Sequence, residues 1–138
     1  MRSDRGSVTL WVLGLSIMLL AMGGLAVDFW RALALQRELA AVADSMAVAA
    51  ASGIDEELYR ATGAVVVDPG RAESLGSSYA GFQDVDLDVV HVTTAPDGTS
   101  VSVLVEGTME LGLLGLFVDE TEPLRVRATA TAIPVLVP

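Results

Sequence analysis

The feature that most constrains this chain is an uncharged run of twenty-two residues near its start, from Gly6 to Val27. As a helix, a run of that size is about 33 Å long, against roughly 30 Å for the hydrocarbon core of a bilayer. Arg2 and Arg5 precede the run and Asp28 follows it. The run therefore predicts a transmembrane helix. The positive-inside rule places its N-terminus in the cytoplasm and the rest of the chain outside.

The same run has two alternatives to a transmembrane helix. A buried helix of a soluble protein needs a large surrounding core, and the remaining chain is too acidic to supply one. A cleaved signal peptide needs small residues at its cleavage site, and Gly24-Leu25-Ala26 provides them. However, the run is longer than a signal peptide's apolar region of about 7–15 residues, and the helical pattern continues through the candidate site. If cleavage occurred there, a secreted acidic domain would remain.

The chain after the apolar run is also typical of a helix. From Asp28 to Ser52 it has no proline and no glycine, and most of its residues are strong helix formers. We expect one continuous helix from about Ser7 to Ala51, roughly 65–70 Å long, ending at Ser52-Gly53. Its second half has an apolar stripe at helical spacing. The stripe consists of Leu35, Leu39, Val42, Met46 and either Ala49 or Ala50.

Alanines in the same segment predict a second surface, on which other helices can come close. These alanines are Ala32, Ala40, Ala41, Ala43, Ala47, Ala50 and Ala51.

The charge of the chain is concentrated in its rear. The net charge is −10; residues 1–54 hold four acids and four arginines, and residues 55–138 hold fourteen acids and four arginines. An acidic head argues against a nucleic-acid partner, because phosphate contacts need clustered basic residues. The chain has no cysteine and one histidine, His91, which excludes disulfides and a zinc site of the usual His and Cys ligands.

The region from residue 54 onward predicts a small α+β head. Helices are expected from Asp55 to about Ala61 and from Asp68-Pro69 to about Ala80, with acids or an N-cap and proline at their starts. Alternating strands are expected over 84–92, 100–105 and 124–133, with a turn at 95–98. We expect three or four antiparallel strands, one face of which is packed under the helices. Arginines on the last strand are placed to face acids on the first.

No catalytic motif is recognisable in the sequence, so we expect no enzyme activity and no cofactor. Asp84, Asp86 and Asp88 suggest calcium, but Val89 and Ala95 stand where an EF-hand loop needs glycine and glutamate. A solvated strand is the simpler reading, and a weak ion site stays open.

The apolar segment from Gly112 to Phe117 has two readings as well. It is either core packing or a loop that faces a partner or the membrane.

The stretch from Arg5 to Gly53 resembles the N-terminus of TadE/TadG-like proteins of the Tad (Flp) pilus assembly system. The resemblance is carried by Arg5-Gly6, an apolar run ending in Gly-Leu-Ala-Val-Asp, an aromatic residue and an arginine, Leu-Gln-Arg, and the segment Ala-Asp-Ser-Met-Ala-Val-Ala-Ala-Ala. The later segment Asp-Pro-Gly-Arg-Ala-Glu-Ser-Leu-Gly-Ser-Ser-Tyr-Ala-Gly is similar too, so the likeness extends over residues 5 to about 82.

The resemblance implies a type IV pilin-like subunit in a bacterial envelope, anchored in the inner membrane and acting as a minor pilin or assembly factor. Its partners would be membrane lipid, other Tad proteins and further copies of the chain. The parts would be a cytoplasmic N-terminus (1–6), a transmembrane half-helix (7–27), an extracytoplasmic amphipathic half-helix (28–53) and the acidic head (54–138). The alternative is an envelope binding module, secreted or anchored, with an acidic head and no role in a pilus.

The residues predicted to act in helix packing and assembly are small residues and charges of the long helix. They are Gly14, Gly23, Gly24, Asp28, Arg31, Arg37, Glu38, Ala40, Asp44 and Ala47. Processed members of such families are cut after a glycine and carry glutamate at the fifth mature position. A cut between Gly6 and Ser7 would place Trp11 there. This departure favours the permanently anchored form and leaves processing open.

Overall fold

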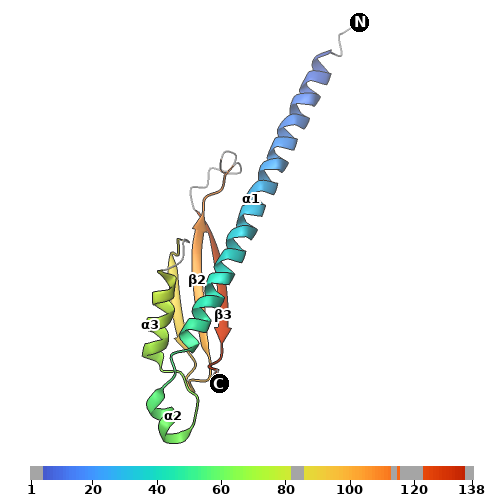
Figure 1. The fold of residues 1–138 in the computed structure, drawn as a ribbon. Helices are drawn as coiled ribbons and strands as arrows, with labels where there is room; N and C mark the ends of the chain where they lie inside the picture. Colours follow the sequence, from blue (N-terminus) through green and yellow to red (C-terminus); the bar gives the residue numbers. More distant parts are fainter. Residues whose placement is uncertain (1–4, 82–85, 113–114, 116–122, 136–138) are drawn as a thin grey trace. The chain divides into compact units, whose positions relative to one another are not determined.

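The computed structural model describes residues 5–81, 86–112, 115 and 123–135. In chain order the elements are α1 (Arg5–Ala51), α2 (Glu56–Thr62), α3 (Pro69–Ala80), β1 (Val89–Thr94), β2 (Val101–Met109) and β3 (Leu124–Ala132) (Figure 1). A long apolar N-terminal helix packed against a three-stranded antiparallel sheet confirms the predicted α+β class. The chain forms two compact units. The first comprises Met1–Leu33 and Met109–Leu124, and the second comprises Ala34–Thr108 and Arg125–Pro138.

Helix α1 is one continuous helix of 47 residues, as predicted (Figure 1). Its segment Ser7–Ala51 is long and apolar enough to cross a membrane by length and composition. Serines do not interrupt it, because their hydroxyls bond to the helix itself. The hydroxyl of Ser16 donates to the carbonyl of Val12 at 2.8 Å, and that of Ser45 donates to the carbonyl of Ala41 at 2.9 Å. In a bilayer such bonds spare a hydroxyl the cost of lying unpaired in hydrocarbon.

The sheet of the second unit has the strand order β1-β2-β3. β1 pairs antiparallel with β2, with Val90 opposite Val105 and His91 opposite Leu104. β2 is the central strand, and its side chains alternate between the two faces of the sheet. Val101, Val103 and Val105 are completely buried on one face.

The C-terminal part of α1 supplies the other side of this core. The predicted stripe is confirmed: Leu39, Val42, Met46 and Ala50 are at most 4% exposed, and Leu35 packs against them. Helix α3 completes the layer beside β1 (Figure 1). A Cβ at Gly76 would lie 2.9 Å from Cγ2 of Val92 and 3.4 Å from Cβ of Ala50, so the missing side chain lets α3 approach both α1 and β1.

The starts of the two short helices follow from their sequences. Asp55 caps α2 by accepting the N–H of Leu58 at 2.9 Å, and Asp68 caps α3 by accepting the N–H of Arg71 at 2.7 Å. Gly63 ends α2 with φ 74°, a left-handed conformation that favours glycine. Both helices therefore lie within a residue or two of their predicted bounds.

Two predictions about the strands need correction. The first strand was expected over 84–92 but runs from Val89 to Thr94, while Asp84 lies outside the described residues. The arginines of the last strand were expected to face acids of the first. β2 lies between β1 and β3, so Arg127 pairs with Glu106 of β2 instead, with Nε and Oε1 2.6 Å apart.

Candidate functional site

The first half of α1 presents a long apolar surface. Its large side chains from Val8 to Val27 are between 48% and 74% exposed, the extremes being Leu15 and Trp11. A soluble monomer rarely exposes so large a contiguous apolar surface, which marks a membrane or partner contact. Because the segment reaches the length of a bilayer core, this surface is the candidate functional site.

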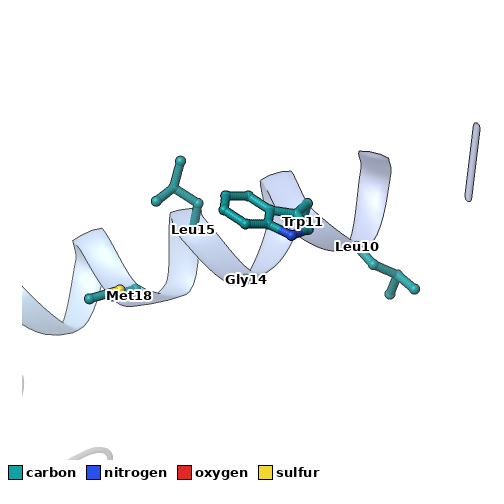
Figure 2. A pocket seen from close by; sticks show the side chains of 5 residues that line it. All are labelled: Leu10, Trp11, Gly14, Leu15 and Met18. Atoms are coloured by element: carbon teal, nitrogen blue, oxygen red, sulfur yellow. The ribbon is translucent and has the colours of Figure 1, made fainter. Parts of the chain in front are cut away.

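A notch interrupts this surface at Gly14. Figure 2 shows Trp11 and Leu15 next to the glycine, with Leu10 and Met18 one turn away on either side along the helix. Among the residues that the structure describes, a Cβ at Gly14 or at Gly23 would meet no atom within 4 Å apart from the helix's own nearby backbone. Two of the three predicted packing glycines are therefore open positions at which another helix can come close to the backbone.

One face of the same segment is covered within the chain. Gly24 is buried and Asp28 is only 2% exposed. The carboxylate of Asp28 accepts a hydrogen bond from the backbone N–H of Gly112, with the two heavy atoms 3.1 Å apart. Both residues were predicted to act in helix packing and assembly. The bond from Gly112 is a contact of Asp28 within the chain, and the role of the two residues between subunits stays a prediction. The exposed Arg31 is near the same contact, since its Nη1 would lie 3.1 Å from a Cβ at Gly112.

The second half of α1 has a polar face toward solvent. The predicted residues Arg37, Glu38, Ala40 and Asp44 are all exposed. Val48 continues that face and is 67% exposed, which is unusual for a valine beside a packed core. Their role in contacts between subunits stays a prediction.

The predicted small-residue surface of this half is divided between the core and the exposed side of α1. Ala43, Ala47, Ala50 and Ala51 are at most 5% exposed and belong to the core of the second unit. With 3.6 residues per turn, these positions lie beside the buried stripe, where small side chains let the neighbouring elements come close. Ala40 and Ala41 remain on the exposed side.

The predicted processing site and the weak ion site both stay predictions, and Asp84 lies outside the described residues. Gly6 and Ser7 lie within the first turns of α1, which begins at Arg5. Asp86 and Asp88 are exposed beside the start of β1. Over the described residues, no group of three His, Cys, Asp or Glu side chains is placed to hold a metal ion.

Sequence reasoning missed a polar hollow where α2 meets the start of α3. It is lined by Asp55, Glu56, Glu57, Arg60, Asp68 and Arg71. Glu56 forms ion pairs with Arg60 at 2.7 Å and with Arg71 at 3.2 Å, so its negative charge is already paired within the chain. The two acidic helix starts were visible in the sequence, but only the fold brings them together.

Comparisons of the chain with protein-family models, with curated proteins and with solved structures find no match. The architecture itself is pilin-like: a long apolar N-terminal helix whose later part packs on a small antiparallel sheet. Its N-terminal helix is able to span a membrane.

Proposed function

We propose that this chain is a membrane-anchored structural subunit, minor pilin-like, of a Tad/Flp-type pilus or a related secretion machine. One observation carries the proposal: a single helix exposes apolar side chains along its first half and buries a stripe in a folded core along its second. Such a helix can be stored in lipid and later packed against other helices, because both surroundings accept the same apolar surface. The resemblance of residues 5 to about 82 to TadE/TadG-like proteins supports the Tad assignment.

In this proposal the chain acts by packing and not by catalysis. The open glycines, Gly14 and Gly23, admit a neighbouring helix close to the backbone. The exposed charges Arg37, Glu38 and Asp44 set the register between subunits, a use for which charges at helix interfaces are known. The N-terminus stays in the cytoplasm and the folded unit lies outside the membrane.

The direct test is isolation of the full chain from its own cells in mild detergent. Other pilus proteins should copurify with it, and fractionation should place it in the inner membrane or in sheared pili. Asp44→Arg should reduce this copurification, while Thr99→Ala, an exposed change in a turn outside α1, should not. If the wild type and Asp44→Arg copurify equally with pilus proteins, Asp44 does not set the register between subunits.

The N-terminus of the mature chain tests which form of the subunit is made. The permanently anchored form keeps residues 1–6, and mass spectrometry of the purified chain should detect them. A mature chain beginning at Ser7 would instead indicate a processed pilin.

The second candidate is an envelope binding module that uses the helix only as an anchor. The polar hollow between α2 and α3 favours it, because a concave acidic surface with two arginines suits a charged ligand. Under this function the chain would purify without pilus proteins. Substitutions in the hollow, such as Glu57→Gln, would then impair its activity more than substitutions on α1.

A further inference from the structure

Asp28 is placed where a carboxylate would be expected to meet lipid. It ends the uncharged run, and its neighbours Phe29 and Trp30 are 64% and 67% exposed. A charged side chain facing hydrocarbon is costly, so such residues are normally covered by protein or directed to water. Asp28 is covered: with 2% of its surface exposed, it is the buried charged side chain of the described residues.

The cover comes from a distant part of the chain within the first unit. The backbone N–H of Gly112 donates to Oδ1 of Asp28 across a separation of 84 residues. A Cβ at Gly112 would lie 2.7 Å from that oxygen and 3.1 Å from Nη1 of Arg31. The backbone can therefore approach α1 this closely only because residue 112 has no side chain.

The covered face extends into the uncharged run. Gly24 is buried and Ala21 is half-buried, whereas Gly23, on another face, is exposed. Gly24 lies about one turn, roughly 6 Å, before Asp28. Protein therefore covers one face of α1 below the level at which the run ends, while the other faces carry exposed apolar and aromatic side chains.

We propose that the chain directly after β2, at Leu111 and Gly112, is a second membrane contact. It enters the outer bilayer interface, lies against α1, and shields the Asp28 carboxylate from lipid. The chemistry of the sequence fits this partner, since the eight residues from Leu111 to Val118 carry no charge. Phe29 and Trp30, at the level of Asp28 on other faces of α1, are the kinds of side chain that favour a bilayer interface. The inference rests on the membrane anchoring in the proposed function.

The absence of cysteine allows a depth measurement on the full chain. Gly115 is exposed, and a Cβ there would make only an ordinary 3.7 Å contact with Cβ of Leu111, so Gly115→Cys is a suitable labelling site. The labelled chain is inserted into phosphatidylcholine vesicles, and a fluorophore at residue 115 is challenged with nitroxide-labelled lipids and with aqueous iodide. Ile17→Cys serves as the reference within the apolar run, and Thr99→Cys as the reference in water.

We expect the label at residue 115 to be quenched by lipid nitroxide and protected from iodide, unlike the label at Thr99. Asp28→Leu removes the acceptor for the Gly112 N–H, so lipid quenching at 115 should fall. Asp28→Asn keeps a side-chain oxygen that accepts this bond, so quenching should persist. Circular dichroism checks that each variant is folded.

The outcomes separate this inference from the proposed function. If the Ile17 label escapes lipid quenching, the chain is not anchored through α1 and both fail. If lipid nitroxide quenches the label at residue 17 while iodide reaches the label at residue 115 as readily as the one at residue 99, only the second membrane contact is refuted. If the label at residue 115 is protected from iodide but is not quenched by lipid nitroxide, protein and not lipid covers residue 115. That result also refutes the second membrane contact. If lipid quenching at residue 115 is unchanged in Asp28→Leu, the carboxylate of Asp28 does not hold this segment at the membrane.

Discussion

Glycines in the second unit lie where neighbouring elements pack too closely to leave room for a side chain. Leu39 on α1 is completely buried, and a Cβ at Gly107 of β2 would lie 3.3 Å from its Cδ2. Gly98 has φ 67°, and a Cβ there would overlap Cγ1 of Val66. The Pro-Asp-Gly turn therefore needs glycine for its conformation and for the approach of the neighbouring segment.

Truncation of Leu39 tests the core. Leu39→Ala should lower the free energy of unfolding by about 2–5 kcal/mol, because it removes buried methyl groups and leaves a cavity. Urea unfolding of the full chain in detergent micelles measures the change. Val48→Ala, on the exposed face of the same helix, should change stability little. Equal effects of the two substitutions would contradict the assigned faces of α1.

The turn after β1 contains a carboxyl group whose titration can be measured. The backbone N–H of Thr99 donates to Oδ1 of Asp97 at 3.1 Å, and its hydroxyl donates at 2.8 Å. These bonds favour the charged form and hold the pKa of Asp97 below its ordinary value of 3.8. Since the pKa is lower in the folded chain, the turn gains stability above pH 3.8. That gain is lost as the pH falls through the lowered pKa.

The Thr99→Ala variant tests this assignment. It removes the hydroxyl donor and keeps the backbone donor, so the pKa of Asp97 should rise part of the way toward 3.8. Titration of the Asp97 carboxyl carbon by NMR measures both values. An unchanged pKa in Thr99→Ala would show that the hydroxyl does not contribute.

At the scale of elements, α1 has two parts with different surroundings. The first exposes apolar side chains, and the second is covered on one side by β2, α3 and the rest of the core. The same helix-forming composition continues through both, so the backbone does not change where the surroundings do. What separates the parts is the identity of the side chains on each face.

The contact of α3 with α1 and β1 gives a prediction for these elements. Gly76→Ala would place a methyl group 2.9 Å from Cγ2 of Val92, a stiff branched side chain that has little freedom to move. We expect a loss of about 1–3 kcal/mol of stability, despite the better helix propensity of alanine. Ser77→Ala on the exposed side of α3 is the control and should be neutral or stabilising. A stabilised Gly76→Ala would show that α3 is not packed this closely.

For the whole molecule, the apolar surface of α1 predicts stable membrane integration. Ile17→Arg combined with Leu20→Arg should weaken integration, since each arginine costs about 2.5–3.5 kcal/mol at the centre of a membrane helix. The fraction resistant to carbonate extraction measures this. Ile133→Arg, at an exposed position after β3, should leave extraction unchanged. Full resistance in the double variant would argue that α1 does not cross the bilayer.

Much of this molecule was predictable because its signals are local. The uncharged run, the absence of glycine and proline from Asp28 to Ser52, and the caps at Asp55 and Asp68 act over a few residues of sequence. They determined the length of α1, the two short helices and the pilin-like outline. The resemblance to TadE/TadG-like proteins adds the proposal of a pilus role, which copurification with other pilus proteins tests.

The tertiary structure alone decided which surfaces remain free. It placed Ala47 in the core, set β2 between β1 and β3, and covered Asp28 with the backbone of Gly112. Each outcome depends on a partner far away in the sequence, and helical periodicity cannot name that partner. The sequence by itself therefore determined the elements of this protein. Only long-range packing decided which of their faces are left exposed for contact with lipid or with a partner.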